Sequence, residues 1–227
     1  RREYTKINPF VVLLGKGEHQ ITSSWADEAG YKNATSLTIT RSNVTFVGTG
    51  KDTTTILGGF RIENVENITF KNMTVTNTSS IGSGIEMSNS KVELFDVALK
   101  RCRHAAIYMP PTTSATTTLV ATRCEFANSP FGVVVDGSLT SATFNNCVFH
   151  DNNHEGIYGG GGATIHLHGE ATAIYSNGEE GIYAHGSGTK VILYLPSHHN
   201  TSYNNGKEDC KSTSGGTITN VDEEADN

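Results

Sequence analysis

One four-residue phrase recurs along the chain and constrains the fold more than any other feature. It reads Glu-Gly-Ile-Tyr at residues 155–158 and again at 180–183, with looser copies upstream. The apolar anchors of all copies are separated by 22, 26, 24 and 25 residues. A period in the twenties predicts a solenoid, in which each repeat buries its apolar face against its neighbours. The anchors are Ile85, Ile107, Val133, Ile157 and Ile182.

Short strands, rather than helices, fill the intervals between the anchors. Residues 37–40 and 44–47 alternate polar and apolar side chains with a period of two, which is typical of half-buried strands. Later segments such as 142–144 and 165–167 repeat this alternation, and no interval shows a helical period. We therefore predict a single all-β domain, a single-stranded parallel β-helix of about seven or eight coils.

The pattern divides the chain into three parts. Residues 1–36 are expected to form an opening strand and a short N-terminal cap, because an uncovered sheet end would recruit other chains. Within this part, the apolar spacing predicts a short amphipathic helix over residues 23–34. Residues 37–220 are expected to form the β-helix, and the acidic residues 221–227 a C-terminal tail that frays.

The charge balance narrows the classes of partner. The formal net charge is -6 and the pI is about 5.8, so the chain has no basic field that would attract nucleic acid. No apolar run approaches the roughly 20 residues of a membrane helix, and we expect no membrane insertion. Because the chain begins with Arg1 rather than Met, removal of an upstream signal peptide stays an open alternative.

The first third of the chain resembles a known group. Residues 15–21, 44–57 and 68–75 are similar to the opening of pectin methylesterases, which belong to the pectin-lyase-like superfamily of right-handed parallel β-helices. The resemblance implies a right-handed β-helix here too. These phrases build turns and core, so they are weakly specific to any activity.

The catalytic motifs of the superfamily are not matched. Pectin methylesterases carry an Asp that acts as the catalytic acid in a phrase that corresponds to residues 103–108 here. They carry a nucleophilic Asp in the next coil, which corresponds to residues 129–133. Neither segment of this sequence contains an Asp or Glu. Polygalacturonases need a paired Asp-Asp, which the sequence lacks. Pectate lyases bind Ca²⁺ through stacked acids and use an Arg base, but no Arg follows residue 123. We therefore expect no catalytic residues and no cofactor, with Ca²⁺ required only if the chain is a lyase.

Strand alternation predicts a row of outward side chains. If the anchors face the core, the residues that follow them point outward, and a second outward row lies two residues further on. Stacked Tyr rings beside acids and His would suit a sugar, because an aromatic ring covers the apolar face of a pyranose while polar groups hydrogen-bond its rim. Alternatively, exposed Tyr ladders simply stabilise a sheet. The candidate ligand-binding residues in these rows are Tyr108, Asp136, Tyr158, Tyr183 and His185.

Two further groups of side chains are candidates for chemistry. His154 and Glu155 occupy a turn, where they complete the candidate binding site; they could act as an acid–base pair, or they could simply be polar residues of the turn. His166 and His168 point outward from one strand, but their expected neighbours are poor ligands, so no metal site is predicted. Cys124 and Cys147 are expected to stack as buried thiols, with a disulfide as the alternative.

Two classes of function remain. The first is a non-catalytic structural or recognition module, with a polysaccharide or other protein subunits as partners. It would be extracellular, on a virion, a cell surface or a secreted particle. The second is a lyase, hydrolase or epimerase that acts on uronic-acid polymers through an atypical site around Tyr158, Tyr183, His154 and His185.

Overall fold

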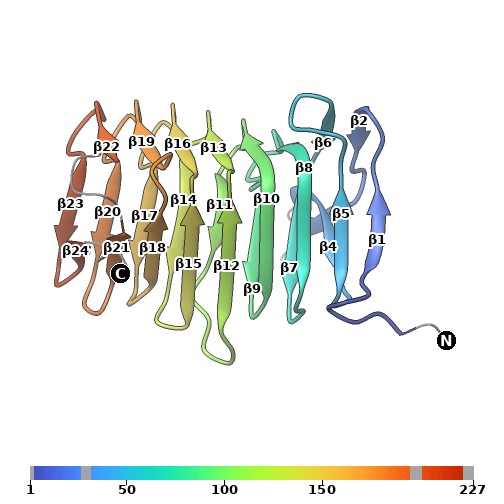
Figure 1. Cartoon of the computed structure of the whole chain (residues 1–227), viewed down its shortest axis with the longest axis horizontal. Helices are drawn as coiled ribbons and strands as arrows, with labels where there is room; N and C mark the ends of the chain where they lie inside the picture. Colours follow the sequence, from blue (N-terminus) through green and yellow to red (C-terminus); the bar gives the residue numbers. More distant parts are fainter. Residues whose placement is uncertain (1–2, 27–31, 195–200, 222–227) are drawn as a thin grey trace, which may run out of the picture.

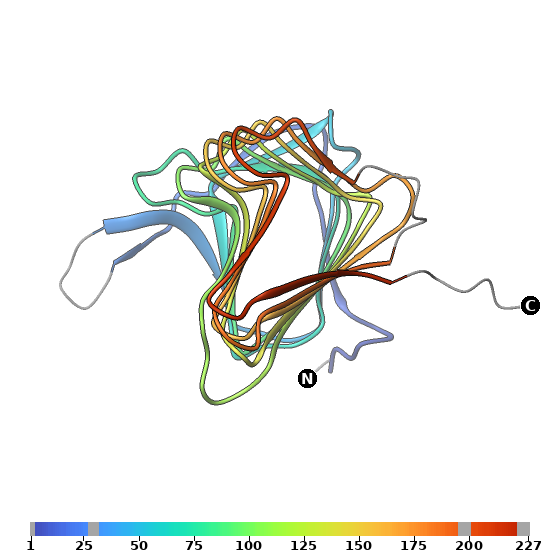
Figure 2. The same cartoon turned by 90° about the vertical axis from the view of Figure 1, so that its left-hand side faces the viewer.

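The computed structural model is a stack of parallel β coils that runs from the N-terminus at one end to the C-terminus at the other (Figure 1). It describes residues 3–26, 32–194 and 201–221; for residues 25, 26 and 32–34 it describes the backbone but not the side chains. The strands form about seven turns. Viewed along the stack, successive coils trace nearly the same outline (Figure 2), which confirms the predicted solenoid. No helix in the described part of the chain is long and apolar enough to cross a membrane.

One face of the stack is a nine-stranded sheet with the order β23-β20-β17-β14-β11-β9-β7-β4-β3. All its pairings are parallel except that between β3 and β4. Its strands are β3 Ser24–Ala26, β4 Lys32–Ile39, β7 Gly59–Glu63, β9 Ile85–Ser88, β11 Ala105–Met109, β14 Phe131–Asp136, β17 Ile157–Gly160, β20 Ile182–His185 and β23 Cys210–Thr213.

The other two faces form a fifteen-stranded sheet, folded along a corner. The long strands β8 and β10 turn this corner within one element, whereas the coils before and after them split it into two short strands. The strands are β1 Phe10–Leu13, β2 Gly17–Gln20, β5 Val44–Val47, β6 Thr54–Leu57, β8 Ile68–Thr76, β10 Lys91–Lys100, β12 Thr117–Thr122, β13 Glu125–Ala127, β15 Thr140–Asn145, β16 Val148–His150, β18 Thr164–His168, β19 Ala173–Tyr175, β21 Lys190–Tyr194, β22 Ser202–Tyr203 and β24 Thr217–Asn220.

Single residues in the left-handed backbone region make the corners. At the corner within the larger sheet, Asp96 has a φ of 52°, and Arg123 and Asn146, one and two coils later, each have a φ of 53°. Asn and Asp tolerate this conformation better than other residues with a Cβ. A second series turns the chain out of that sheet: Arg101, Asn128, Asp151, Ser176 and Asn204. The polar composition of the chain therefore reflects repeated corners.

The anchor residues fill the interior of the coils. Ile85, Ile107, Val133, Ile157 and Ile182 are each 0% exposed, and the strand register aligns them one above another, as predicted. Phenylalanine rings from the other sheet pack in the same interior. Apolar burial of this kind, at about 25 cal/mol per Å², is the main force that holds the coils together.

A buried polar ladder runs beside this apolar core. The Asn152 Nδ2 donates to Asn177 Oδ1 at 2.9 Å, and the Asn177 Nδ2 donates to Asn205 Oδ1 at 2.9 Å. The same amides reach the main chain, since Asn177 Nδ2 also donates to the Phe149 carbonyl oxygen at 3.2 Å. Cys102 occupies the equivalent position nearer the N-terminus, where its backbone N–H donates to Ser129 Oγ at 3.0 Å. The ladder thus binds both backbone N–H groups of the turns, such as that of Asn152, and carbonyl oxygens of the adjoining strands, such as that of Phe149.

The cysteines are free thiols, so the stacked-thiol interpretation is confirmed and the disulfide alternative is wrong. Cys124 and Cys147 lie on adjacent coils, and the Cys124 N–H donates to Cys147 Sγ at 3.4 Å. Burial raises the pKa of the Cys102 thiol to about 11, which keeps that thiol protonated at neutral pH.

The helix expected over residues 23–34 is wrong where the structure describes the segment. β3 and β4 pair antiparallel with each other instead, while residues 27–31 lie outside the described residues. Tertiary pairing overrides the local apolar spacing, because β4 also pairs in parallel with β7 of the next coil. β3 thereby occupies the N-terminal edge of the nine-stranded sheet, and the pair projects from the side of the stack (Figure 2). Of the acidic tail, residues 222–227 also lie outside the described residues.

The asparagine ladder leads to a stability prediction. Asn177→Ala should lower the free energy of unfolding by about 2–4 kcal/mol, because buried partners such as the Phe149 carbonyl oxygen and the Asn152 side chain lose hydrogen bonds. The matched control is Asn153→Ala, at an exposed neighbouring turn position, which should change stability by no more than about 0.5 kcal/mol. Urea denaturation measures both, and equal losses would contradict a structural role for the ladder.

Candidate functional site

The predicted outer row exists on the nine-stranded sheet. Parallel register places Glu86, Tyr108, Val134, Tyr158 and Tyr183 side by side on successive coils, each half-buried, as predicted. The row continues at both ends with cations that the sequence analysis missed, because Arg61 pairs with Glu86 and Lys211 pairs with Tyr183. Extending the period one step towards the N-terminus would have found Arg61, which lies 25 residues before Glu86, whereas Lys211 lies 28 residues after Tyr183, beyond the spacings of the repeat.

Tyr158 and Tyr183 meet edge to face. Their ring centroids are 5.7 Å apart and their planes make an angle of 77°. The Lys211 ammonium lies 5.8 Å from the Tyr183 centroid, close enough for an attractive cation–π contact. The two rings are therefore nearly perpendicular to each other, rather than stacked flat as the sequence suggested.

Gly160 makes room for the Tyr158 ring. A Cβ on Gly160 would stand 2.8 Å from Tyr158 Cε1 and 3.0 Å from both the Tyr158 hydroxyl and Asp136 Oδ1, so a larger residue would displace them. The Tyr158 hydroxyl and the Asp136 carboxylate consequently flank one point on the surface. Burial and the charge of Asp136 raise the pKa of Tyr158, which keeps its hydroxyl protonated and able to donate.

Tyr183 and His185 share a third partner. The Tyr183 hydroxyl and His185 Nδ1 each lie 2.9 Å from Thr213 Oγ1, and 3.3 Å from each other. Thr213 belongs to the next coil, where it aligns with His185. The sequence analysis missed it because the repeat phrase is not recognisable in that last coil. The triangle of hydrogen bonds holds both side chains in fixed positions on the face.

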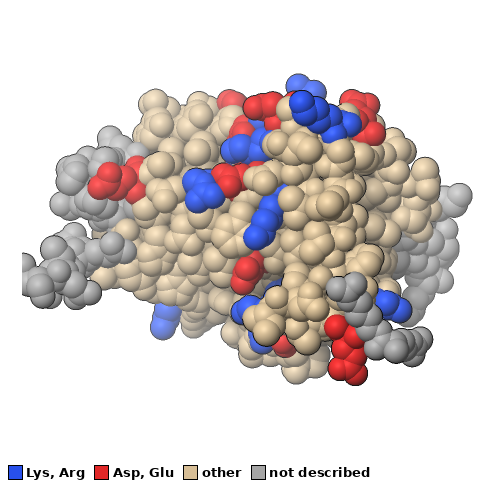
Figure 3. All heavy atoms as spheres, turned by 45° about the vertical axis from the view of Figure 1, so that its right-hand side comes forward, with Lys and Arg blue, Asp and Glu red and all other residues tan. Residues whose placement is uncertain are grey.

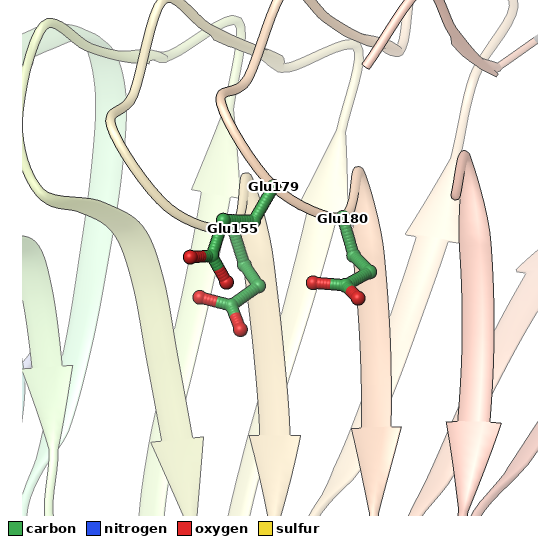
Figure 4. Close-up of side chains that lie close together, drawn as sticks. All are labelled: Glu155, Glu179 and Glu180. Atoms are coloured by element: carbon green, nitrogen blue, oxygen red, sulfur yellow. The ribbon is translucent and has the colours of Figure 1, made fainter. Parts of the chain in front are cut away.

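Three glutamates gather where β17 and β20 begin (Figure 4). Each offers a carboxylate oxygen, and these oxygens lie within 4.8 Å of one another. Glu155 was predicted as a site residue, whereas Glu179 and Glu180 were missed. Burial, together with the charges of Glu179 and Glu180, raises the pKa of Glu155.

His154 does not pair with Glu155, its neighbour in sequence. Its Nδ1 lies 3.2 Å from Glu179 Oε1 of the next coil, and Glu179 also forms an ion pair with Lys207 at 2.9 Å. Contacts in this turn therefore run along the stack rather than along the chain, and they favour a structural role in the turn over an acid–base pair of His154 with Glu155.

A strip of rings extends the site towards the N-terminal coils. His104 meets Tyr108 with centroids 4.9 Å apart and Phe131 at 6.1 Å, and Phe131 meets His154 at 4.9 Å. Burial lowers the pKa of His104, which favours the neutral imidazole. The strip joins two predicted residues, Tyr108 and His154, through two that the sequence analysis missed. His104 and Phe131 lie before the regular alternation begins, where strand periodicity says nothing.

Hollows on the described surface lie away from the predicted site residues. Three of them, with volumes of about 300, 360 and 440 Å³, are lined by none of the predicted site residues. The 360 Å³ hollow lies over the corner of the larger sheet, between Lys51, Arg123, His150 and Tyr175. Basic and acidic side chains intermingle on the face drawn in Figure 3, so this face carries no broad field of one sign. None of these three hollows therefore contributes to the predicted site.

The expected surroundings of His166 and His168 are confirmed. The register places Thr143 and Ile192 beside His166, and Asn145 and Tyr194 beside His168. The His168 and Tyr194 rings stack with centroids 4.3 Å apart. These neighbours bring neither a carboxylate nor a third imidazole, so the pair is a stacked surface feature.

Parallel coils stacked around one core define a parallel β-helix, and the comparison with known families specifies the kind. The family described as "Right handed beta helix region" matches residues 18–205. Because this match covers most of the chain, the protein belongs to that family. The resemblance to right-handed β-helix proteins is confirmed.

Solved structures share this architecture at low sequence identity. The Azotobacter vinelandii mannuronan C-5 epimerase AlgE6 A-module superposes with a TM-score of 0.68 at 15% identity, covering 93% of this chain and 60% of that chain. This chain therefore spans 60% of the length of that structure, and the likeness shows the fold alone. The AlgE4 A-module of the same organism has a TM-score of 0.43 at 14% identity, covering 95% of this chain and 83% of that one. Geobacillus virus E2 ORF18 has a TM-score of 0.44 at 11% identity, covering 93% of this chain and 54% of that one. A search of curated proteins finds no match.

Glu86 leads to a pH prediction. Burial raises its pKa above the ordinary value of 4.5, with Arg61 opposing and Glu63 adding to the shift. As the pH rises past 4.5, the unfolded chain loses this proton first, so the free energy of unfolding falls until folded Glu86 ionises. Glu86→Gln should remove that part of the decline, as measured by urea denaturation across the pH range. The exposed Glu170→Gln is the control, and identical pH profiles for the two variants would contradict the assignment.

Proposed function

We propose that the chain is a non-catalytic recognition module that binds a carbohydrate chain along the outer face of the nine-stranded sheet. One observation carries this function. Tyr158 and Tyr183 lie side by side on adjacent coils, and fixed hydrogen-bonding groups flank both rings. A sugar ring has an apolar face and a polar rim, and such a strip complements both.

The hydrogen-bonding groups around the tyrosines suit sugar hydroxyls. On one side, Asp136 accepts and the protonated Tyr158 hydroxyl can donate. On the other side, the Tyr183–His185–Thr213 triangle offers groups that can donate or accept. Since these groups come from neighbouring coils at a spacing of about 4.8 Å, an extended chain lying along the stack would meet several of them.

The charges favour a neutral carbohydrate over a uronic-acid polymer. Asp136, Glu155 and Glu180 border the tyrosines, and the chain as a whole has a formal net charge of -6. An anionic polymer would be repelled at close range. We therefore place neutral glycans first among candidate ligands, and uronic-acid polymers second.

The architecture suits a rigid spacer on a virion, a cell surface or a secreted particle. Within the described residues, each inner coil is hydrogen-bonded to the coils on both sides, and backbone paired in this way resists proteolysis. Other protein subunits would pack against its remaining faces. The location and these partners belong to the same proposal as the glycan.

The test is a glycan-array screen on the purified chain, followed by titration of a bound glycan. Tyr158→Ala and Tyr183→Ala should each weaken binding by at least about tenfold, because losing about 1.4 kcal/mol of ring contact changes an affinity by that factor. The matched control is Tyr194→Ala, which removes a tyrosine from the same coil as Tyr183 but from the other sheet, and should leave the affinity unchanged.

Two outcomes would contradict this function. Equal affinities for wild type and both tyrosine variants would place the ligand elsewhere on the rod. Turnover of pectate or alginate, seen as rising absorbance at about 235 nm or as altered products, would establish the enzymatic alternative, since recognition alone leaves the polymer intact.

A further inference from the structure

The glutamate cluster at the start of β17 and β20 has a composition that carbohydrate recognition does not explain. Glu155 and Glu180 occupy equivalent positions on adjacent coils, and Glu179 lies beside them (Figure 4). We propose that Glu155, Glu179 and Glu180 bind one Ca²⁺ ion, which joins these two coils. The ion would lie at the edge of the tyrosine face, by which we mean the outer surface of the nine-stranded sheet around Tyr158 and Tyr183.

The spacing of the carboxylates fits a shared ion. Ca²⁺ binds oxygen ligands at about 2.3–2.6 Å, so two ligand oxygens of one ion lie at most about 5 Å apart. One oxygen from each glutamate lies within 4.8 Å of the other two. The three side chains turn towards one another from two coils (Figure 4), so an ion between them would contact all three.

Glu155 supplies an independent reason to place a cation here. Its side chain is 7% exposed, and its Oε2 atom is buried with no hydrogen-bond partner among the described residues. Leaving a buried carboxylate oxygen unpaired is costly, and buried charges are normally paired or bound to a metal. A cation in the cluster would satisfy the Oε2 atom, whereas the ion pairs of the described residues in the cluster involve only Glu179 and Glu180.

The neighbouring lysines leave one negative charge uncompensated. Lys207 lies 2.9 Å from Glu179 Oε2, and Lys211 lies 2.8 Å from Glu180 Oε1, so two ammonium groups face three carboxylates. Lys211 is also shared with Glu208 at 3.3 Å, which weakens its hold on Glu180. The excess charge therefore falls on Glu155, the member without an ion pair.

The donor set selects the ion. Carboxylate oxygens suit hard cations such as Ca²⁺, Mg²⁺ and Mn²⁺, whereas Zn²⁺ prefers nitrogen and sulfur ligands. Mg²⁺ demands a nearly ideal octahedron and gives up its water reluctantly, while Ca²⁺ accepts irregular sets of six to eight oxygens. Three side chains from two coils form an irregular set, with water completing the shell, and this favours Ca²⁺.

The first experiment is calorimetric titration of the metal-free full chain with CaCl₂ at neutral pH, with no carbohydrate present. Wild type should bind one Ca²⁺ at this cluster with a Kd below about 1 mM. Glu155→Gln keeps the size of the side chain, removes the unpaired charge, and should weaken binding at least tenfold. Glu170→Gln removes an exposed carboxylate outside the cluster and should bind as wild type does. Equal affinities for the two variants would overturn the site, as would the absence of binding to wild type.

A second variant keeps the test informative if Glu155→Gln fails to fold. Lys207→Met removes the ammonium that competes for Glu179, and should therefore tighten Ca²⁺ binding several-fold. Thermal unfolding provides an independent readout. Saturating Ca²⁺, at about 100 times Kd, should raise the Tm of wild type and of Lys207→Met by about 5–10 °C. Unchanged Tm values, or weaker binding by Lys207→Met, would overturn the site. Because no glycan is used, failure here leaves the proposed carbohydrate function untouched.

Discussion

The backbone hydrogen bonds between coils are the interaction on which the rest of the structure depends. Each parallel strand finds its partners in the coil before and the coil after, so the register of one pair sets the register of the next. This continuity aligns the anchors Ile107, Val133, Ile157 and Ile182 inside the stack, and their successors Tyr108, Tyr158 and Tyr183 outside it. The same strand register therefore sets both the packing of the interior and the arrangement of the candidate site.

The sequence predicted most where the strands are regular. The period of the anchors defined the coils, and alternation placed Tyr158, Asp136 and His185 on the outer face, because a strand has only two faces. Prediction failed at the turns, where no alternation relates one side chain to another. Glu179 and Glu180 immediately precede β20, and only the three-dimensional turn brings them to Glu155. The prediction for residues 23–34 failed for another reason. β3 pairs antiparallel with the first half of β4, whose second half pairs with β7 of the next coil, and local spacing cannot report such contacts.

The tyrosine face and the turn that holds the three glutamates differ in the kind of ligand that each suits. The tyrosine face offers rings flanked by hydrogen-bonding groups, an arrangement for which we propose a carbohydrate ligand. The turn concentrates Glu155, Glu179 and Glu180 against Lys207 and Lys211, an arrangement that suits a small cation. Both rest on contacts along the stack: His154 meets Glu179, and Tyr183 meets Thr213, each one coil away. A substitution in one coil therefore affects the side-chain contacts of the adjacent coils more directly than those of the rest of the chain.

The repeated corners have a consequence for how such a chain can evolve. Each coil closes on itself through left-handed corner residues such as Asp96, Arg123 and Asn146, and presents nearly the same outline to the next coil (Figure 2). Duplication or deletion of a whole coil outside residues 105–213 would leave equivalent surfaces to rejoin. The number of coils between the tyrosine face and the N-terminal end can thus change during evolution while the face itself stays the same.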